Sequence, residues 1–202
     1  MMKLETETSE LSEYLAASEV IDYEDENIQA VGRHLSTYGK TEVEFAKAAY
    51  EYVRDRIPHS CDIQGKTVTW KASKVLSEKE GICYAKSHLL AAILRSQKIP
   101  TGFCYQKLVF DDSEPSYLTL HGLNAIYLES IKRWIRVDAR GNKPGVNAEF
   151  SLVREALAFP VRENWGEIDY QTIYTQPNKK VVSALKTSNT LEELLSHLPT
   201  DL

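Results

Sequence analysis

Three residues whose side chains together support nucleophilic catalysis occur in order along the chain: Cys83, His121 and Asp138. A thiolate is the reactive form of cysteine, and a histidine activates it when an acidic side chain orients the imidazole ring. Cys83 follows Gly81 in the first turn of a predicted helix. The partial positive charge and free N–H groups at a helix start favour a thiolate and can receive a developing oxyanion.

Each of these residues also has an ordinary structural explanation. Free cysteine is among the most buried residue types and usually packs as a small apolar group. A histidine within a strand is often bonded to backbone, and an aspartate after a strand often caps a loop. Lys86, one turn after Cys83, strengthens the case for chemistry only if its ammonium group points the same way.

Helical patterns surround Cys83 in the first half of the chain. Thr41 and Glu44 form a capping box that opens a helix, and this helix ends before Pro58 because the residue before proline avoids helical conformation. A second helix is predicted over Ile82–Gln97, and its apolar residues on nearly all sides indicate burial. Shorter helices are predicted over residues 25–35 and 72–76 and after Thr190.

The pattern after residue 100 is typical of strands. The segments Gly102–Phe110, Leu118–Leu128 and Arg133–Asp138 are rich in β-branched and aromatic residues, and the second and third are close enough to form a hairpin. A further strand is predicted within Trp165–Tyr174. Helices followed by neighbouring strands predict an α+β fold with an antiparallel sheet.

The predicted hairpin would bring His121 and Asp138 together. His121 lies a few residues farther from the turn than Asp138 does, so the two are not directly opposite. A bulge or a diagonal contact across the ladder would close this gap.

Length and composition restrict the class of protein. The chain has 202 residues with 43% apolar and 26% charged residues, as expected for one globular domain that buries its own core. The net charge of -5 lacks the basic surface of a nucleic-acid binder, so we expect no nucleic-acid partner. Residues 1–10 do not resemble a signal peptide, and no apolar window approaches a membrane span, so we expect a cytoplasmic protein without a membrane partner.

The cysteines and acidic residues show no pattern typical of a metal site. The three cysteines lack zinc spacing, and no acidic loop resembles a calcium site, so we expect no metal and no cofactor. Cys104 lies within a predicted strand and is interpreted as core, whereas Cys61 lies in a loop over residues 59–71. Disulfides are not expected in a reducing compartment.

We expect one domain over residues 25–202, with a core at about 40–140 and a C-terminal elaboration over 141–202. An acidic extension over residues 1–24 would precede it, and residues 1–10 would form a loose tail.

Several segments of this sequence resemble the core of the transglutaminase-like superfamily. In that family a Gly-x-Cys opens the central helix, a Leu-Arg-Ser/Ala-x-x-Ile-Pro segment closes it, and a histidine and an aspartate follow on later strands. The matching segments are Tyr50–Ile57, Glu80–Ser87, Leu94–Pro100, His121–Tyr127 and Trp134–Asp138.

The resemblance implies a papain-like arrangement, with the helix that carries Cys83 packed against an antiparallel sheet. Cys83 would attack a carboxamide and form a thioester. His121 would protonate the leaving amine and then activate the acceptor, while Asp138 would orient His121.

The sequence departs from the family pattern near His121, where Gly122 replaces alanine and Leu123 replaces tryptophan. The resemblance also implies a second oxyanion donor from a side chain upstream of the cysteine. Its candidates are Gln64, Trp70 and His59, and the candidates for the cleft wall are Tyr84, Tyr105, Gln106 and Gly122.

Three acceptors are compatible with this chemistry. Water would make the protein a peptidase or other amidase, a primary amine would make it a transglutaminase, and a glycosylated asparagine substrate would make it similar to peptide N-glycanases. The small size, the lack of additional domains and the expected cytoplasmic setting favour hydrolysis of a peptide, a protein amide or a small amide. A non-catalytic binding module on the same fold is the alternative from another class.

Overall fold

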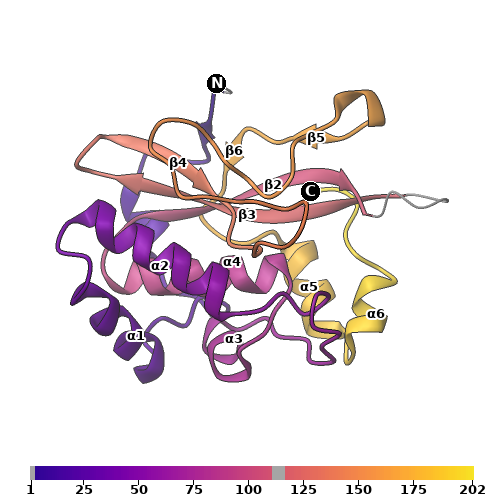
Figure 1. Cartoon of the computed structure of the whole chain (residues 1–202), viewed down its shortest axis with the longest axis horizontal. Coiled ribbons are helices and arrows are strands. Elements are labelled where there is room, and N and C mark those ends of the chain that lie inside the picture. The colour runs from indigo at the N-terminus through magenta and orange to yellow at the C-terminus, as the bar shows by residue number, and fades with distance from the viewer. Residues whose placement is uncertain (1–2, 111–116) are drawn as a thin grey trace.

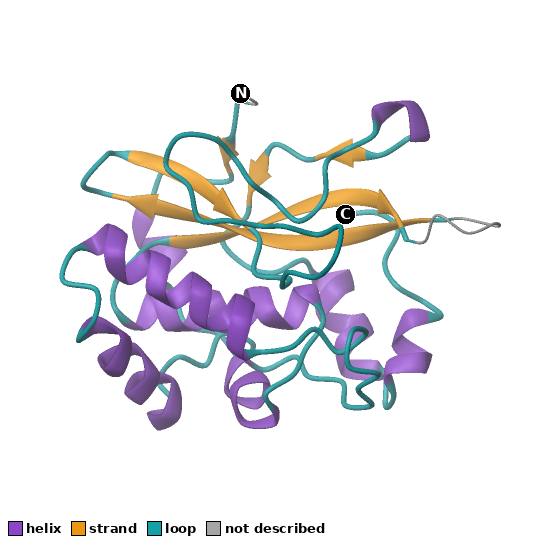
Figure 2. Ribbon diagram, in the orientation of Figure 1, coloured by secondary structure: helices purple, strands orange, loops and turns teal. Residues whose placement is uncertain are grey.

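The computed structural model describes residues 3–110 and 117–202 and has a layer of helices against one side of a sheet (Figure 1). Figure 2 shows the longer helices together below the strands, with a short 3-10 helix and small strands above them. Over the described ranges, none of the helices combines the length and apolar composition that crossing a membrane requires. The predicted α+β fold class is confirmed.

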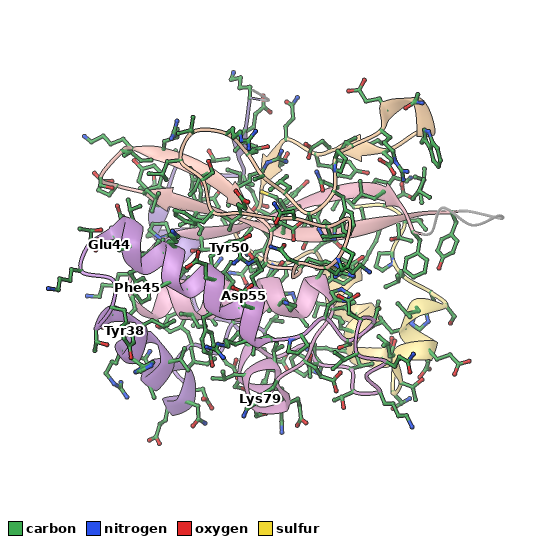
Figure 3. The ribbon with its side chains drawn as sticks, viewed as in Figure 1. Tyr38, Glu44, Phe45, Tyr50, Asp55 and Lys79 are labelled. Atoms are coloured by element: carbon green, nitrogen blue, oxygen red, sulfur yellow. The ribbon has the colours of Figure 1, made fainter. Side chains whose placement is uncertain are left out.

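The first four α-helices lie close to the positions predicted from sequence. The capping box is present: the Thr41 hydroxyl accepts from the Glu44 N–H at 3.2 Å, and the Glu44 carboxylate accepts from the Thr41 N–H at 3.0 Å. Figure 3 shows Glu44 and Asp55 near opposite ends of the helix that this box opens, with Tyr50 between them. The four helices are α1 (Glu26–Ser36), α2 (Glu42–Arg56), α3 (Ala72–Glu78) and α4 (Cys83–Ser96).

Helix α4 is the buried centre of the molecule, as its composition predicted. Every residue from Tyr84 to Arg95 is buried, and α1, α2, α3 and the sheet all pack against the helix. Arg95 closes its far end by donating to the carbonyls of Thr101, Ala16 and Thr175. A buried guanidinium that finds carbonyl partners in three segments holds the helix in a single position.

The main sheet is antiparallel, with the strand order β4-β3-β2-β5. The second and third predicted strands pair as the expected hairpin. The segment predicted as one strand within Trp165–Tyr174 instead holds two short strands that pair with different partners. The strands are β2 (Thr101–Val109), β3 (Leu118–Leu128), β4 (Arg133–Val137), β5 (Ile168–Asp169), and the separate pair β1 (Glu5–Thr6) and β6 (Thr172–Ile173).

The N-terminal segment differs from the expected loose tail, because it is folded onto the sheet. Strand β1 pairs with β6, and the 3-10 helix η1 (Leu11–Leu15) buries Tyr14 completely. The Tyr14 hydroxyl donates to the Ile173 carbonyl at 3.0 Å, and its ring packs edge-on against Trp134. Its many acidic residues are typical of an exposed tail, but Tyr14 joins Cys104, Leu123, Ala125 and Ile173 in a small buried cluster apart from the main core.

The chain after β4 forms a long loop, a 3-10 helix η2 (Glu163–Trp165) and two helices, α5 (Lys179–Thr187) and α6 (Leu191–Leu195). Helix α6 begins after Thr190 as predicted, and the Thr190 hydroxyl accepts from the Glu193 N–H at 3.1 Å. Helix α5 was not predicted. Both helices lie on the same side of the sheet as α4 (Figure 1).

Lys86 fixes the first turn of α4 against two other segments. Its ammonium group is fully buried and donates to the carbonyls of Arg54 and Ile57 at the end of α2 and to the Arg140 carbonyl, at 2.9 Å for the last. The contact with Arg54 spans 3.3 Å. Lys86 is therefore a link between the start of α4, the end of α2 and the loop after β4.

We predict that Lys86→Met lowers the free energy of unfolding by about 2–4 kcal/mol, because a buried acceptor left without a donor costs roughly 1–3 kcal/mol. Urea denaturation followed by circular dichroism measures the change. Lys74→Met is the matched control, because Lys74 is an exposed lysine on α3. An equal, small effect of both substitutions would contradict the structural role of Lys86.

Candidate active site

The site lies where β3 extends beyond the end of β4. The β4 ladder covers only Asn124–Leu128, so β4 does not pair with the preceding part of β3. The first turn of α4 meets β3 there, and the Tyr84 hydroxyl donates to the Leu120 carbonyl. A Cβ atom at Gly122 would lie 2.7 Å from the Tyr84 ring, which is too close for an unshifted contact. The glycine that departs from the family pattern thus permits this close approach of α4.

His121 and Asp138 meet by the diagonal contact that the sequence suggested. The regular ladder ends at Asn124 opposite Val137, so one further step would set Asp138 opposite Leu123. His121 precedes Leu123 by two residues on β3, and its Nε2 lies 2.8 Å from the Asp138 carboxylate. No bulge interrupts the ladder between Asn124 and Leu128.

Asp138 is a completely buried carboxylate with several donors around it. Besides His121, the backbone N–H groups of Arg140 and Ala158 donate to it at 3.0 and 3.1 Å. Burial alone would raise the pKa of Asp138, but His121 and these N–H groups outweigh it and lower the pKa. The carboxylate is therefore negatively charged at neutral pH.

His121 is buried between Asp138 and Cys83. Burial tends to lower the pKa of His121, but the negative charges and hydrogen bonds of Asp138 and Cys83 prevail and raise it. Because Nε2 bonds Asp138, the ring has Nδ1 left for the Cys83 thiol. The Phe159 ring packs edge-on against the imidazole at 5.2 Å between centroids and holds its plane.

Cys83 is the first residue of α4 and is half-buried. Its backbone N–H has no acceptor within the helix, as is usual for a first helical residue. Instead this N–H lies 3.2 Å from Nε2 of His59. The thiol therefore stands at the positive end of a helix and beside the imidazole of His121.

The loop that carries His59 is pinned next to Cys83 by a short parallel bridge between His59 and Gly81. The Gly81 N–H donates to the Pro58 carbonyl at 3.3 Å, and the Ser60 N–H donates to the Gly81 carbonyl at 3.2 Å. These two backbone bonds hold the loop that carries the imidazole beside the start of α4.

The His59 ring is neutral, which restricts its hydrogen bonds. Burial, with the positive charge of Arg140 as a second cause, lowers the pKa of His59 to about 3. The N–H groups of Cys61 and Cys83 approach Nδ1 and Nε2 at 3.3 and 3.2 Å, but a neutral imidazole accepts at one nitrogen only. In the tautomer that accepts from Cys61, Nε2–H stands beside the Cys83 N–H as a second donor.

An ion-pair cluster joins the loop of His59 to the loop that follows Asp138. The Arg140 guanidinium binds both oxygens of the Asp62 carboxylate, and the Lys143 ammonium binds the same carboxylate at 3.0 Å. Burial opposes ionisation of Asp62, but the bonds from Arg140 and Lys143 lower its pKa to about 2. The pairs hold the two loops together beside the candidate nucleophile.

Cys83, His121 and His59 open into a cavity of about 700 Å³. This volume is in the range of small-molecule and peptide side-chain sites. Apolar side chains from β2, β3, the loop after β4 and the C-terminal region form much of its wall, and charged side chains lie at several points. They are Leu108, Val109, Phe110, Leu120, Phe159, Pro160, Leu195 and Leu198, with Arg140, Lys143, Arg162 and Glu167.

The structure brings together only some of the candidates named from sequence. Tyr84 and His59 line the cavity, as do Cys83 and His121. Asp138 lies behind His121 and is sealed from solvent.

Two candidates for the second oxyanion donor lie elsewhere. Gln64 is an exposed residue at a turn, with φ of 53°, and Trp70 is covered by the Lys186 ammonium, 4.3 Å from its ring centroid. Neither lines the cavity. The turn over residues 60–64 directs Gln64 to solvent, while Trp70 is held beside α5 through the cation–π contact.

Three candidates for the cleft wall do not line the cavity either. Tyr105 and Gln106 are buried in β2, and the Tyr105 hydroxyl instead accepts from the Asn178 N–H at the start of α5. Gly122 is covered by Tyr84. Strand β2 contributes Leu108 and Val109 to the cavity wall in place of Tyr105 and Gln106.

Other residues of the site were missed from sequence. Arg140 and Phe159 come from the loop after β4, Asp62 lies in the loop before α3, and Leu195 and Leu198 come from the C-terminal region. Arg140, two residues after Asp138, had a positional signal. The others are far apart in sequence, and only the tertiary fold gathers them.

A cysteine at a helix start thus lies beside a histidine of β3 and a buried carboxylate directly after β4, an arrangement typical of cysteine-dependent enzymes. The transglutaminase-like superfamily model matches residues 29–139, and the chain belongs to this superfamily, a family of cysteine-dependent enzymes. The sequence resemblance is thus confirmed. No curated protein matches the chain.

Solved structures with similar folds come from three bacteria. A proposed cysteine protease from Cytophaga hutchinsonii is 18% identical, with a TM-score of 0.49, over 68% of this chain and 46% of that one. The periplasmic domain of TgpA from Pseudomonas aeruginosa is 13% identical (TM-score 0.44; 62% and 45%), and a proposed protease from Parabacteroides distasonis is 11% identical (TM-score 0.41; 75% and 30%). The chain spans less than half the length of these proteins.

We predict that His121→Ala changes the pH profile of Cys83 alkylation by iodoacetamide and slows alkylation at neutral pH, because the imidazolium no longer lies beside the thiol. Peptide mass spectrometry separates Cys83 from the other cysteines. His34→Ala is the control, since His34 is exposed on α1. An unchanged profile in His121→Ala would remove His121 as the partner of the thiol.

Proposed function

We propose that this protein is a cysteine-dependent acyl transferase that hydrolyses a peptide or another carboxamide through a thioester on Cys83. The observation that carries the proposal is the buried His121–Asp138 pair at 2.8 Å, beside a cysteine at the start of α4. A carboxylate that orients an imidazole next to a thiol is the arrangement that nucleophilic catalysis requires.

In the first half of the reaction the Cys83 thiolate attacks the carbonyl carbon of the amide. A carbon–sulfur bond forms, and the carbonyl electrons move to oxygen. The His121 imidazolium then gives its Nδ1 proton to the leaving nitrogen as the carbon–nitrogen bond breaks. Asp138 keeps the ring in place and stabilises its positive charge.

The tetrahedral oxyanion lies next to the first turn of α4. The backbone N–H of Cys83 is one donor, and the Nε2–H of His59 is the second in the tautomer that accepts from Cys61. In the resting geometry the Cys83 N–H faces His59 itself, so the substrate oxygen takes the place of that contact. Two fixed donors at a developing charge are a major source of rate acceleration.

In the second half water attacks the thioester. Neutral His121 takes a proton from the water molecule, the carbon–sulfur bond breaks, and the thiolate and imidazolium are restored. A primary amine in place of water would give a new amide. The same residues would serve either acceptor, so the acceptor is decided by what enters the cavity.

The cavity favours a peptide-like acyl group. Its apolar wall suits an aliphatic or aromatic side chain, and the side chains of Arg140, Lys143 and Arg162 also line the cavity. A volume of about 700 Å³ is larger than a single small amide needs. These features support a peptide or protein amide as the substrate class.

The proposal is tested by trapping the acyl-enzyme. The protein is incubated with a library of peptides and small amides and quenched in acid, and the Cys83 peptide is searched by mass spectrometry for added acyl mass. We expect an adduct on Cys83 and loss of all turnover in Cys83→Ala. Cys104→Ala is the control, since Cys104 is buried in β2 away from the site.

Turnover that persists in Cys83→Ala would contradict Cys83 as the nucleophile. A protein that never carries an adduct and never releases amine would contradict the enzyme proposal and favour a binding module. Repeating the incubation with a primary amine distinguishes the acceptors. An amine-linked product at the expense of the free acid would identify a transglutaminase, and deglycosylation of a glycopeptide would identify an N-glycanase-like activity.

We predict that His59→Ala lowers kcat by about 10²–10³-fold, the usual effect of removing one oxyanion donor. His59→Gln should retain more activity, because its amide nitrogen can still donate. Iodoacetamide alkylation of Cys83, which forms no oxyanion, should change far less than kcat does. A parallel fall of alkylation and kcat would instead mean that His59 acts only through the position of Cys83.

A further inference from the structure

Cys61 is a second half-buried free thiol in the cavity that holds Cys83. The proposed mechanism makes no use of its side chain. It comes from the loop between α2 and α3, whereas Cys83 begins α4, so the fold brings together two cysteines from separate segments.

One imidazole ring links the two cysteines. The N–H of Cys61 lies 3.3 Å from Nδ1 of His59, and the N–H of Cys83 lies 3.2 Å from Nε2 of the same ring. The parallel bridge pairs His59 with Gly81, and each cysteine follows its bridge residue by two positions. The two backbones therefore run side by side toward the cavity.

We propose that Cys61 is a resolving cysteine that forms a reversible disulfide with Cys83 when a hydroperoxide oxidises Cys83. The proposal rests on the reactive Cys83 thiolate of the proposed function. The disulfide would stop amide hydrolysis at this cavity, and reduction of the disulfide would restore it.

The two steps balance without any further reagent. The Cys83 thiolate attacks the hydroperoxide, a sulfur–oxygen bond forms, the oxygen–oxygen bond breaks, and His121 gives a proton to the departing oxygen. Cys61 then attacks the Cys83 sulfur. A sulfur–sulfur bond forms, and the sulfur–oxygen bond breaks. The Cys61 proton leaves with that oxygen as water. Cys83 has lost two electrons to the peroxide, and a dithiol reductant returns them.

The surroundings of the two thiols assign the order of events. Burial, followed by the negative charge of Cys83, raises the pKa of Cys61. Cys61 therefore stays a thiol while Cys83, at the helix start beside His121, meets the peroxide first. Peroxide that reached a Cys83 without a neighbour would carry it on to irreversible sulfinic acid.

A disulfide requires Cα atoms about 4.4–6.8 Å apart. The His59 ring lies between the N–H groups of the two cysteines, so the turn that carries Cys61 moves toward the start of α4 when the disulfide forms. Asp62, the next residue in the loop, is held by Arg140 and Lys143, which limits how far Cys61 can move away. The third cysteine, Cys104, is fully buried in β2 in the other core cluster and serves as the control.

The experiment treats the whole chain with hydrogen peroxide, then with dithiothreitol, and maps its cysteines by mass spectrometry. We expect a Cys61–Cys83 cross-linked peptide, loss of Cys83 alkylation by iodoacetamide, and recovery of alkylation after reduction. In Cys61→Ser, Cys83 should accumulate sulfinic acid and fail to recover. Cys104→Ser should behave as the unsubstituted protein does.

Absence of the cross-linked peptide, or equal recovery of Cys83 in Cys61→Ser, would overturn the inference. Alkylation of Cys83 at neutral pH before peroxide is added reports separately on the proposed function. Normal alkylation of Cys83 without a cross-linked peptide would contradict the disulfide proposal and leave the proposed function intact. A Cys83 that does not react with iodoacetamide would contradict the proposed function. The presence or absence of the cross-linked peptide would then report on the disulfide separately.

Discussion

The buried carboxylate of Asp138 is the constraint around which the site is arranged. An ionised group without solvent needs several donors, and here they come from β3 through His121, from the turn after β4 through the Arg140 N–H, and from the long loop through the Ala158 N–H. The need to satisfy one charge thus fixes three segments. It also gives the imidazole its charge, its orientation and the ring nitrogen that faces Cys83.

Positive charge near Cys83 is used for two different purposes. The partial charge of the α4 start and the His121 imidazolium act on the thiol. Lys86, which is one turn along the same helix, does not contribute in this way, since its donors are directed to carbonyls of α2 and of Arg140. Its function is positional: it holds the helix that bears the thiol against the loop that follows Asp138, so the distance between nucleophile and carboxylate does not depend on the sheet alone.

Local patterns in the sequence predicted most of the elements, because capping residues and hydrophobic periodicity act within a few residues of each other. The Thr41–Glu44 box and the apolar α4 are examples. Hairpin geometry predicted that His121 and Asp138 meet through a bulge or a diagonal contact, and the regular β3–β4 ladder leaves the diagonal contact. The choice among His59, Gln64 and Trp70 could not be made in this way, because it depends on a bridge between His59 and Gly81 that joins residues distant in sequence.

The same bridge explains why the loop of His59 matters to both chemistries at this site. It sets one neutral imidazole between two backbone N–H groups, of which a given tautomer can satisfy only one. When Nδ1 of His59 accepts from the Cys61 N–H, Nε2 carries the proton and can donate to an oxyanion. When Nε2 accepts from the Cys83 N–H, the oxyanion has no second donor. A disulfide between Cys61 and Cys83 would displace the His59 ring from its place between the two N–H groups. Oxidation would therefore remove the nucleophile and the oxyanion donor together.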